Sequence, residues 1–282
     1  MLGGQFKTVI LLALLTALLL WVGSLWSTTG LVVAAIFVLL MNLGSYWFSD
    51  KVVLMMYRAR EAKEPEYSKL HSIVSEVAQR ANLPKPKVYV IDSPVANAFA
   101  TGRNPKHAAI AVTKGIMDLL TADELKGVLS HEAAHIKNRD ILISTVAGTI
   151  AGVISYVAAV ARWSAIFGFG GKDRDNNLLE LLVLAIITPL IATLIQLAIS
   201  RSREYIADAT GSGFLHSGLG LASALEKLQS HSKRFFFPLT GSTQATAHLF
   251  ITNPLKGSGL MHLLSTHPPT HERIRRLRSQ TF

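Results

Sequence analysis

The chain has 282 residues, of which 50% are hydrophobic, with a mean hydropathy of +0.35 and no cysteine. That hydropathy excludes an ordinary soluble protein and favours a membrane protein, while the lack of cysteine excludes disulfides and thiolate metal ligands. The formal net charge of +10 comes without a recognised nucleic-acid motif, so we expect no nucleic-acid partner and attribute the excess to membrane topology.

Two apolar runs open the chain. Residues 8–26 and 31–48 are almost wholly apolar and are separated by a short polar turn. Each run approaches the roughly 20 residues that a helix needs to cross a bilayer, so we predict a transmembrane hairpin over residues 1–48. A cleaved signal peptide is the alternative for the first run, but its apolar core is too long and no convincing cleavage site precedes the second run.

Basic residues follow the second run directly. Lys51, Arg58, Arg60 and Lys63 contrast with the uncharged turn at residues 27–30. By the positive-inside rule, the segment from Lys51 onward lies in the cytoplasm, and so does the N-terminus. The apolar runs then make the lipid bilayer a partner of the chain.

A first cytoplasmic part is predicted over residues 49–140. Apolar residues at helical spacing predict a helix within 65–81. Three segments have the composition of strands: 87–91, 98–101 and 108–113. We expect a small antiparallel sheet, with residues 97–102, beginning at Asn97, as an edge strand that holds an extended substrate by backbone pairing. A purely structural hairpin is the open alternative for that segment.

The next helix carries the clearest chemistry. Thr121 and Glu124 are spaced as in a capping box at its start. His131 and His135 are four residues apart and share one face of this helix, where both can bind one zinc ion. Glu132 points beside the metal, which suits a general base for a zinc-bound water. The alternative is two ordinary histidines on a helix surface with a solvated glutamate.

Two further apolar runs, 141–163 and 178–200, predict a second transmembrane hairpin over residues 141–200. The chain then returns to the cytoplasm for residues 201–282. Glu204 lies just beyond this hairpin and is the best third zinc ligand, completing a set of two histidines and one glutamate with one position open for water. Asp208 lies one helical turn later and can orient a ligand histidine. A solvated helix face is the alternative for both carboxylates.

With these features in hand, the chain resembles the HtpX-like membrane-bound zinc metalloproteases of bacterial membrane quality control. It is similar, more distantly, to the CAAX prenyl endopeptidases. The matching segments are NAFATG at 97–102, SHEAAHIKNRD at 130–140, SRSREYIAD at 200–208, ITNPL at 251–255 and STHPPTHERIRRL at 265–277. They cover much more of the chain than the two histidines and the glutamate alone.

The resemblance implies a mainly α membrane protein with four transmembrane helices and a cytoplasmic α+β zincin-like domain. It implies one zinc ion per chain, with His131, His135 and Glu204 as ligands and Glu132 as the catalytic base. It also implies that Asp208 supports the ligands from behind.

The same resemblance implies polypeptide substrates, namely misfolded or damaged membrane proteins that are cut in their cytoplasmic regions during a stress response. The location implied is the bacterial inner membrane, with the catalytic part and both termini in the cytoplasm. His267 and Arg273 are placed near the active site, where one supports the substrate or the oxyanion. A structural capping role is the alternative for His267.

Two other functions remain open from the residues alone. An intramembrane protease would hold the motif at hydrocarbon depth, which Lys126 and the polar segment 137–140 oppose. A metal transporter would use the histidines and carboxylates as transit ligands. Such a transporter needs ionisable residues inside the spans, and these spans are nearly empty of them.

Overall fold

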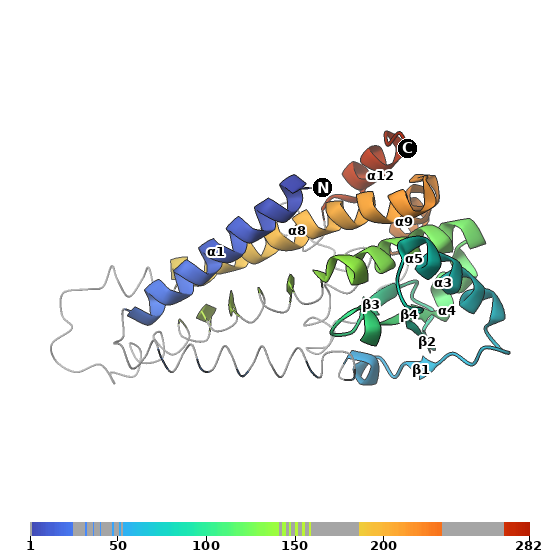
Figure 1. Ribbon diagram of the computed structural model, residues 1–282, viewed down its shortest axis with the longest axis horizontal. Coiled ribbons are helices and arrows are strands. Elements are labelled where there is room, and N and C mark those ends of the chain that lie inside the picture. The colour runs from blue at the N-terminus through green and yellow to red at the C-terminus, as the bar shows by residue number, and fades with distance from the viewer. Residues whose placement is uncertain are drawn as a thin grey trace. The chain divides into compact units, whose positions relative to one another are not determined.

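The computed structural model describes residues 2–24, 53–140, 186–232 and 268–282, with isolated residues between 32 and 51 and between 143 and 158 (Figure 1). The chain divides into two compact units, each assembled from stretches that are distant in sequence. Unit 1 comprises Met1–Tyr46 and Ile143–Ser200, and unit 2 comprises Trp47–Leu142 and Arg201–Phe282. Helix α8 (Thr188–Leu215) begins in unit 1 and ends in unit 2.

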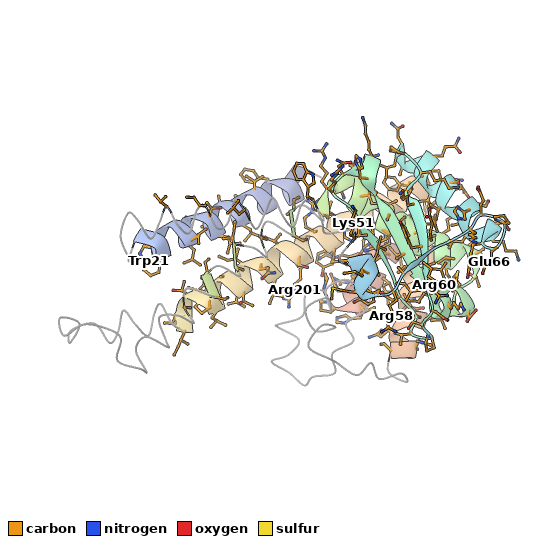
Figure 2. All side chains as sticks on the ribbon, turned by 90° about the horizontal axis from the view of Figure 1, so that it is seen from below. Trp21, Lys51, Arg58, Arg60, Glu66 and Arg201 are labelled. Carbon is orange, nitrogen blue, oxygen red and sulfur yellow. The ribbon has the colours of Figure 1, made fainter. Side chains whose placement is uncertain are left out.

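Unit 1 contains helix α1 (Leu2–Ser24) and the beginning of α8. One buried cluster of unit 1 consists of small or branched apolar side chains from three parts of the chain: Leu15, Leu19, Ala147, Ile150, Ala151, Ile154, Ala192 and Ile199. Large apolar side chains of α1 also point outward, among them Phe6, which is 68% exposed, and Trp21 (Figure 2). Helix α1 therefore presents apolar residues both to the buried cluster and to its surroundings.

None of the helices within the described part of the chain combines the length and hydropathy needed to cross a membrane. The predicted spans at 31–48 and 141–163 lie mostly outside the described residues, as do residues 178–185 of the predicted fourth span. The exposed basic residues Lys51, Arg58 and Arg60, from which the cytoplasmic side was predicted, belong to unit 2 (Figure 2).

The sheet of unit 2 has four strands: β1 (Arg60–Glu61), β2 (Lys87–Ile91), β3 (Ala98–Thr101) and β4 (Ala109–Thr113). Their order is β1-β2-β4-β3, so β3 is at an edge among the described strands, as predicted. The prediction of an antiparallel sheet is wrong, because β2 and β4 are parallel. The reason is topological. Strands β3 and β4 form an antiparallel hairpin, and β4, not β3, lies next to β2, so β4 runs in the same direction as β2.

The helices of unit 2 share one buried cluster with this sheet (Figure 1). They are α3 (Ser68–Ala81), α4 (Lys114–Leu119), α5 (Ala122–Asn138), the end of α8, α9 (Leu219–Ser232) and α12 (Thr270–Arg278). Among them, α4 and α5 contact the strands of the sheet directly. The helical spacing predicted within 65–81 is confirmed, because Leu70, Val74 and Val77 of α3 are buried. Helix α5 lies between α3 and α9 and contacts β3, which places it at the centre of the unit.

Candidate metal centre

Helix α5 begins as the sequence predicts. The Thr121 side chain accepts a hydrogen bond from the backbone N–H of Glu124, and the Glu124 carboxylate accepts one from the backbone N–H of Thr121. This reciprocal pair satisfies two N–H groups that the first turn of a helix leaves without partners. The helix ends at Asn138, and Arg139 follows in the left-handed conformation with φ 56°.

His131 and His135 lie one turn apart on α5, with their rings at 86° to each other. Their Nε2 atoms are 3.0 Å apart. Both Nδ1 atoms face carboxylates: Asp208 Oδ1 is 3.0 Å from His131, and Asp140 Oδ2 is 2.8 Å from His135. A ring that is neutral and carries its proton on Nδ1 can offer its Nε2 lone pair to a metal ion, and the two Nε2 atoms face each other.

Glu204 on α8 brings a third acceptor to the same point. Its carboxylate oxygens lie 3.4 Å from His135 Nε2 and 3.6 Å from His131 Nε2. The ligand atoms of the three side chains all lie within 4.8 Å of one another. Ligands bound tetrahedrally at about 2.0–2.1 Å from a zinc ion are about 3.3 Å apart, so the observed separations fit one ion.

The electrostatics of these groups also favour a cation. Burial alone would lower the pKa of His135, but the carboxylates of Asp140 and Glu204 outweigh burial and raise it well above its usual range. The site therefore attracts positive charge at the point where the three acceptors meet. The donor set, two imidazoles and one carboxylate, matches what a divalent metal ion binds.

Asp208 lies one turn beyond Glu204, as predicted, and is held by Arg273 of α12. The guanidinium donates to both Asp208 oxygens, at 2.8 and 2.7 Å, and lies 3.2 Å from Glu204 Oε2. Burial alone would raise the pKa of Asp208, but Arg273 and His131 outweigh it and lower this pKa to about 2. Arg273, which is 1% exposed, thus lies behind two carboxylates of the site.

Glu132, the predicted base, is buried at the start of the cluster and faces the edge strand. Its Oε2 accepts a 2.8 Å hydrogen bond from the backbone N–H of Ala100 in β3. Burial raises the pKa of Glu132, and electrostatic interaction with the two neighbouring histidines lowers it only in part. A carboxylate with a raised pKa is suited to accept a proton and hold it.

The other two predicted site residues are placed differently. Asn97 is buried directly before β3, and its backbone is tied to Thr113 of β4: its N–H donates to the hydroxyl, and its carbonyl accepts from the Thr113 N–H and hydroxyl. The structure therefore shows Asn97 anchoring the edge strand. His267 lies outside the described residues, and α12 begins three residues later at Thr270.

Sequence reasoning missed two residues, Asp140 and Arg203. Asp140 contacts the Nδ1 atom of His135, and the Arg203 guanidinium donates to the other oxygen of Asp140. Both side chains are 3% exposed. The available signal was their position, since Asp140 follows the end of α5 and Arg203 directly precedes Glu204.

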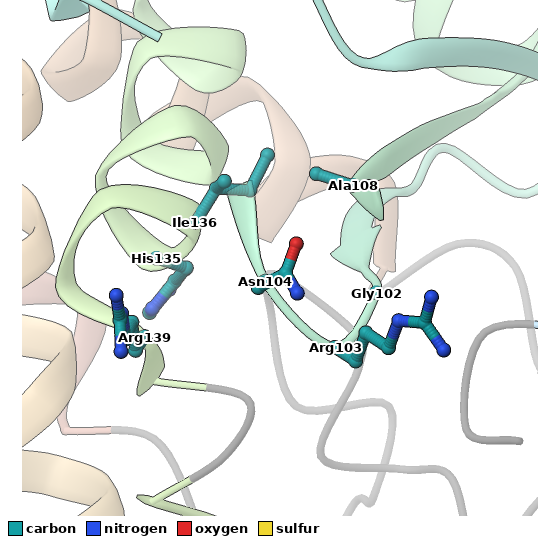
Figure 3. A pocket seen from close by; sticks show the side chains of 7 residues that line it. All are labelled: Gly102, Arg103, Asn104, Ala108, His135, Ile136 and Arg139. Carbon is teal, nitrogen blue, oxygen red and sulfur yellow. The ribbon is translucent and has the colours of Figure 1, made fainter. Parts of the chain in front are cut away.

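A small hollow opens beside His135 (Figure 3). It lies between the β3–β4 connection and the C-terminal end of α5, and its lining residues are Gly102, Arg103, Asn104, Ala108, His135, Ile136 and Arg139. The Arg103 side chain points away from His135 and lies over the Trp47 ring. The hollow therefore adjoins the metal cluster at the end of the edge strand.

The comparisons with known proteins agree with this geometry. The sequence model of peptidase family M48 matches residues 64–281. A protease HtpX homolog of Syntrophobacter fumaroxidans is 52% identical over 282 residues, covering 98% of this chain and 99% of that protein. One from Pyrococcus furiosus is 49% identical over 278 residues, covering 98% and 96%.

The crystal structure of S. mikatae Ste24p has the same fold, with a TM-score of 0.58 at 20% identity. The match covers 98% of this chain and 66% of that longer one. The matched family region contains every residue of the metal cluster. The chain therefore belongs to peptidase family M48 and is a metalloprotease.

Proposed function

We propose that the chain is a zinc-dependent endopeptidase of membranes, with His131, His135 and Glu204 as ligands of one zinc ion and Glu132 as the catalytic base. The observation that carries the proposal is the convergence of three acceptor atoms from two helices beside a buried carboxylate. Two imidazoles and one carboxylate leave one position open, which is the arrangement of catalytic zinc sites. When bound, zinc would polarise the substrate carbonyl and lower the pKa of a water molecule.

Glu132 moves the proton in this reaction. Its raised pKa lets it accept a proton from the attacking water and retain it until the amine leaves. The Ala100 N–H fixes one carboxylate oxygen, so the other is available for the proton. Glu132 then returns the proton to the leaving nitrogen, and the peptide bond is broken.

Strand β3 is the proposed substrate-binding edge. Successive residues of a strand direct their backbone groups to alternate sides, and the Ala100 N–H points toward Glu132. The N–H and C=O of Ala98 and the C=O of Ala100 share that side and are available to an extended substrate. Asn97 supports this edge from its N-terminal end.

The proposed role of Arg273 is to support the ligands, since its guanidinium is engaged by Asp208 and Glu204. His267 precedes the helix that carries Arg273 and remains our proposed substrate-supporting residue. Of His267 and Arg273, we propose His267 as the residue that contacts the substrate or the oxyanion.

The proposed substrates are misfolded or damaged membrane proteins, cut in cytoplasmic segments. Exposed apolar side chains of unit 1, such as Phe6 and Val9, support contact between this unit and lipid. The names of the HtpX homologs support a protease of the same kind. We propose four spans at 8–26, 31–48, 141–163 and 178–200 in the bacterial inner membrane, with both termini in the cytoplasm and a role in stress response.

Topology can be tested because the chain has no cysteine. Single cysteines introduced at residues 170–175, between the third and fourth proposed spans, are expected to react with an impermeant reagent added to intact cells. A single cysteine introduced in place of Lys63 is expected to react only after lysis. Labelling of residues 170–175 only after lysis would contradict the four-span arrangement.

The peptidase reaction is tested by comparing the wild type with Glu132→Gln in detergent, using an unfolded protein as substrate and verified equal zinc content. Loss of a general base is expected to slow cleavage by about 100-fold or more. Glu124→Gln is the matched control, because it makes the same change eight residues earlier on the same helix. Equal cleavage by wild type and Glu132→Gln would remove Glu132 from the mechanism.

A further inference from the structure

Asp140 bridges a predicted zinc ligand and a buried arginine. One carboxylate oxygen lies 2.8 Å from His135 Nδ1, and the other accepts from the Arg203 guanidinium. The residue follows the left-handed Arg139, which ends α5 and turns the chain back toward His135. Each oxygen of this buried carboxylate therefore has a partner of its own.

Arg203 links this carboxylate to the helix that carries Glu204. Its Nε donates to Asp140, and a second guanidinium nitrogen donates to the Asn138 carbonyl at 3.4 Å. Asn138 is the last residue of α5, so Arg203 contacts both the end of that helix and Asp140, two residues beyond it. Because Arg203 and Glu204 are adjacent in sequence, this contact fixes the spacing between two helices that supply ligands.

Stability alone is a poor explanation for such a pair. Desolvation of two buried charges offsets much of their attraction, and an apolar pair of similar size is often equally stable. The other predicted ligand histidine has the same arrangement, with Asp208 beside its Nδ1 and Arg273 behind Asp208. The same histidine–aspartate–arginine arrangement thus occurs at both histidines, although its residues come from different parts of the chain. This repetition indicates that both arrangements serve the metal site.

We propose that Asp140 and Arg203 are positioning residues for His135. Asp140 holds the ring proton on Nδ1 and fixes the ring plane, so that the Nε2 lone pair faces the metal. Arg203 holds the Asp140 carboxylate in place through its hydrogen bond, and couples the His135 ring to the segment that bears Glu204. This inference rests on the proposed zinc site.

Metal binding by the full-length protein in detergent tests the pair without using activity. Metal-free protein is titrated with Zn²⁺ against a chromogenic chelator and with Co²⁺, whose visible spectrum reports ligand geometry. Asp140→Asn is expected to weaken Zn²⁺ binding by about 10- to 100-fold and to change the Co²⁺ spectrum. Arg203→Met should reproduce both effects, and Arg203→Lys should partly restore them.

Glu124→Gln is again the matched control, because it disturbs a carboxylate network at the other end of α5 and should leave metal binding unchanged. Wild-type affinity and Co²⁺ spectrum in both Asp140→Asn and Arg203→Met would overturn the inference. So would equal losses in the control, which would show a general effect of destabilising α5. Failure of the wild type to bind Zn²⁺ would instead overturn the proposed function on which the inference rests.

Discussion

The two ends of helix α5 carry buried polar networks of opposite kinds. At its start, the Glu124 carboxylate accepts from the Thr121 N–H at 2.8 Å, the Ser223 hydroxyl at 2.6 Å and the Lys227 ammonium at 2.7 Å. Near its end, the Nε2 atoms of His131 and His135 face each other and the Glu204 carboxylate. The Glu124 oxygens accept from three donors, whereas the second network gathers three side chains that can all bind one metal ion.

This difference separates stability from function along one helix. A satisfied carboxylate lowers the free energy of the folded chain by itself and requires no ligand. Converging acceptors repel one another, and a bound cation turns that repulsion into attraction. Changes at the start of α5 should therefore alter stability, whereas changes near its end should alter metal binding. The four predictions below test this separation.

Metal removal should have the largest effect on activity. A strong chelator is expected to abolish peptidase activity, and added Zn²⁺ should restore it. Zinc at about 100 times its dissociation constant should raise the free energy of unfolding by about 2.7 kcal/mol, measured by chemical denaturation with and without the ion. Glu124→Gln should start from a lower stability and show the same increase. Undiminished cleavage after verified metal removal would contradict the metal site.

Removal of the arginine behind the metal site should have the largest effect on the stability of the metal-free protein. Arg273→Met leaves Asp208 and Glu204 without their buried cation, so the metal-free protein should lose about 3–5 kcal/mol of stability. The comparable change at the start of α5 is Lys227→Met. The Lys227 side chain is 41% exposed, and its loss should cost about 1 kcal/mol or less. Denaturant unfolding of both variants checks the ranking, and equal costs would refute it.

Local signals predicted much of this site. The capping box fixed the start of α5, and a spacing of four residues placed His131 and His135 on one face. Contacts between side chains or strands that are distant in sequence could not be predicted in the same way. Arg203 and Asp140 are 63 residues apart, and neither has a local pattern that selects the other. The parallel alignment of β2 and β4 likewise depends on where β3 docks, which strand composition does not encode.

The pH dependence of stability should report the first network. Burial alone would raise the pKa of Glu124, but hydrogen bonds from Lys227, Ser223 and Thr121 outweigh it and lower this pKa to about 2. A pKa below the unfolded value of about 4.5 means that ionised Glu124 stabilises the fold above that pH. This stabilisation, at most about 3 kcal/mol, should disappear as the pH falls from 4.5 toward 2.

The measurement is the difference in free energy of unfolding between wild type and Glu124→Gln, at pH 7 and again near pH 3. The difference isolates Glu124, because other titrating groups contribute to both proteins. It should be large at the higher pH and shrink at the lower one. A difference that is independent of pH would mean that Glu124 contributes through packing and not through its charge.

Substitution of two glycines should give the smallest losses of stability. It should also test most sharply whether the start of α5 serves stability and its end serves metal binding. A Cβ atom at Gly127 would lie 2.5 Å from the backbone nitrogen of Leu221, and one at Gly211 would lie 2.9 Å from the backbone nitrogen of His131. These contacts are with backbone, so an added methyl group must shift a helix. Overpacking costs about 1–3 kcal/mol, and the better helix propensity of alanine recovers about 1 kcal/mol.

Gly127→Ala and Gly211→Ala should therefore each lower stability by up to about 2 kcal/mol. Only Gly211→Ala moves the backbone that carries His131, so it alone should weaken Zn²⁺ binding, measured by chelator competition. Equal losses of affinity in both variants would show that strain travels along α5 from one end to the other. The two networks would then be coupled through the helix, and its start would contribute to function as well as to stability.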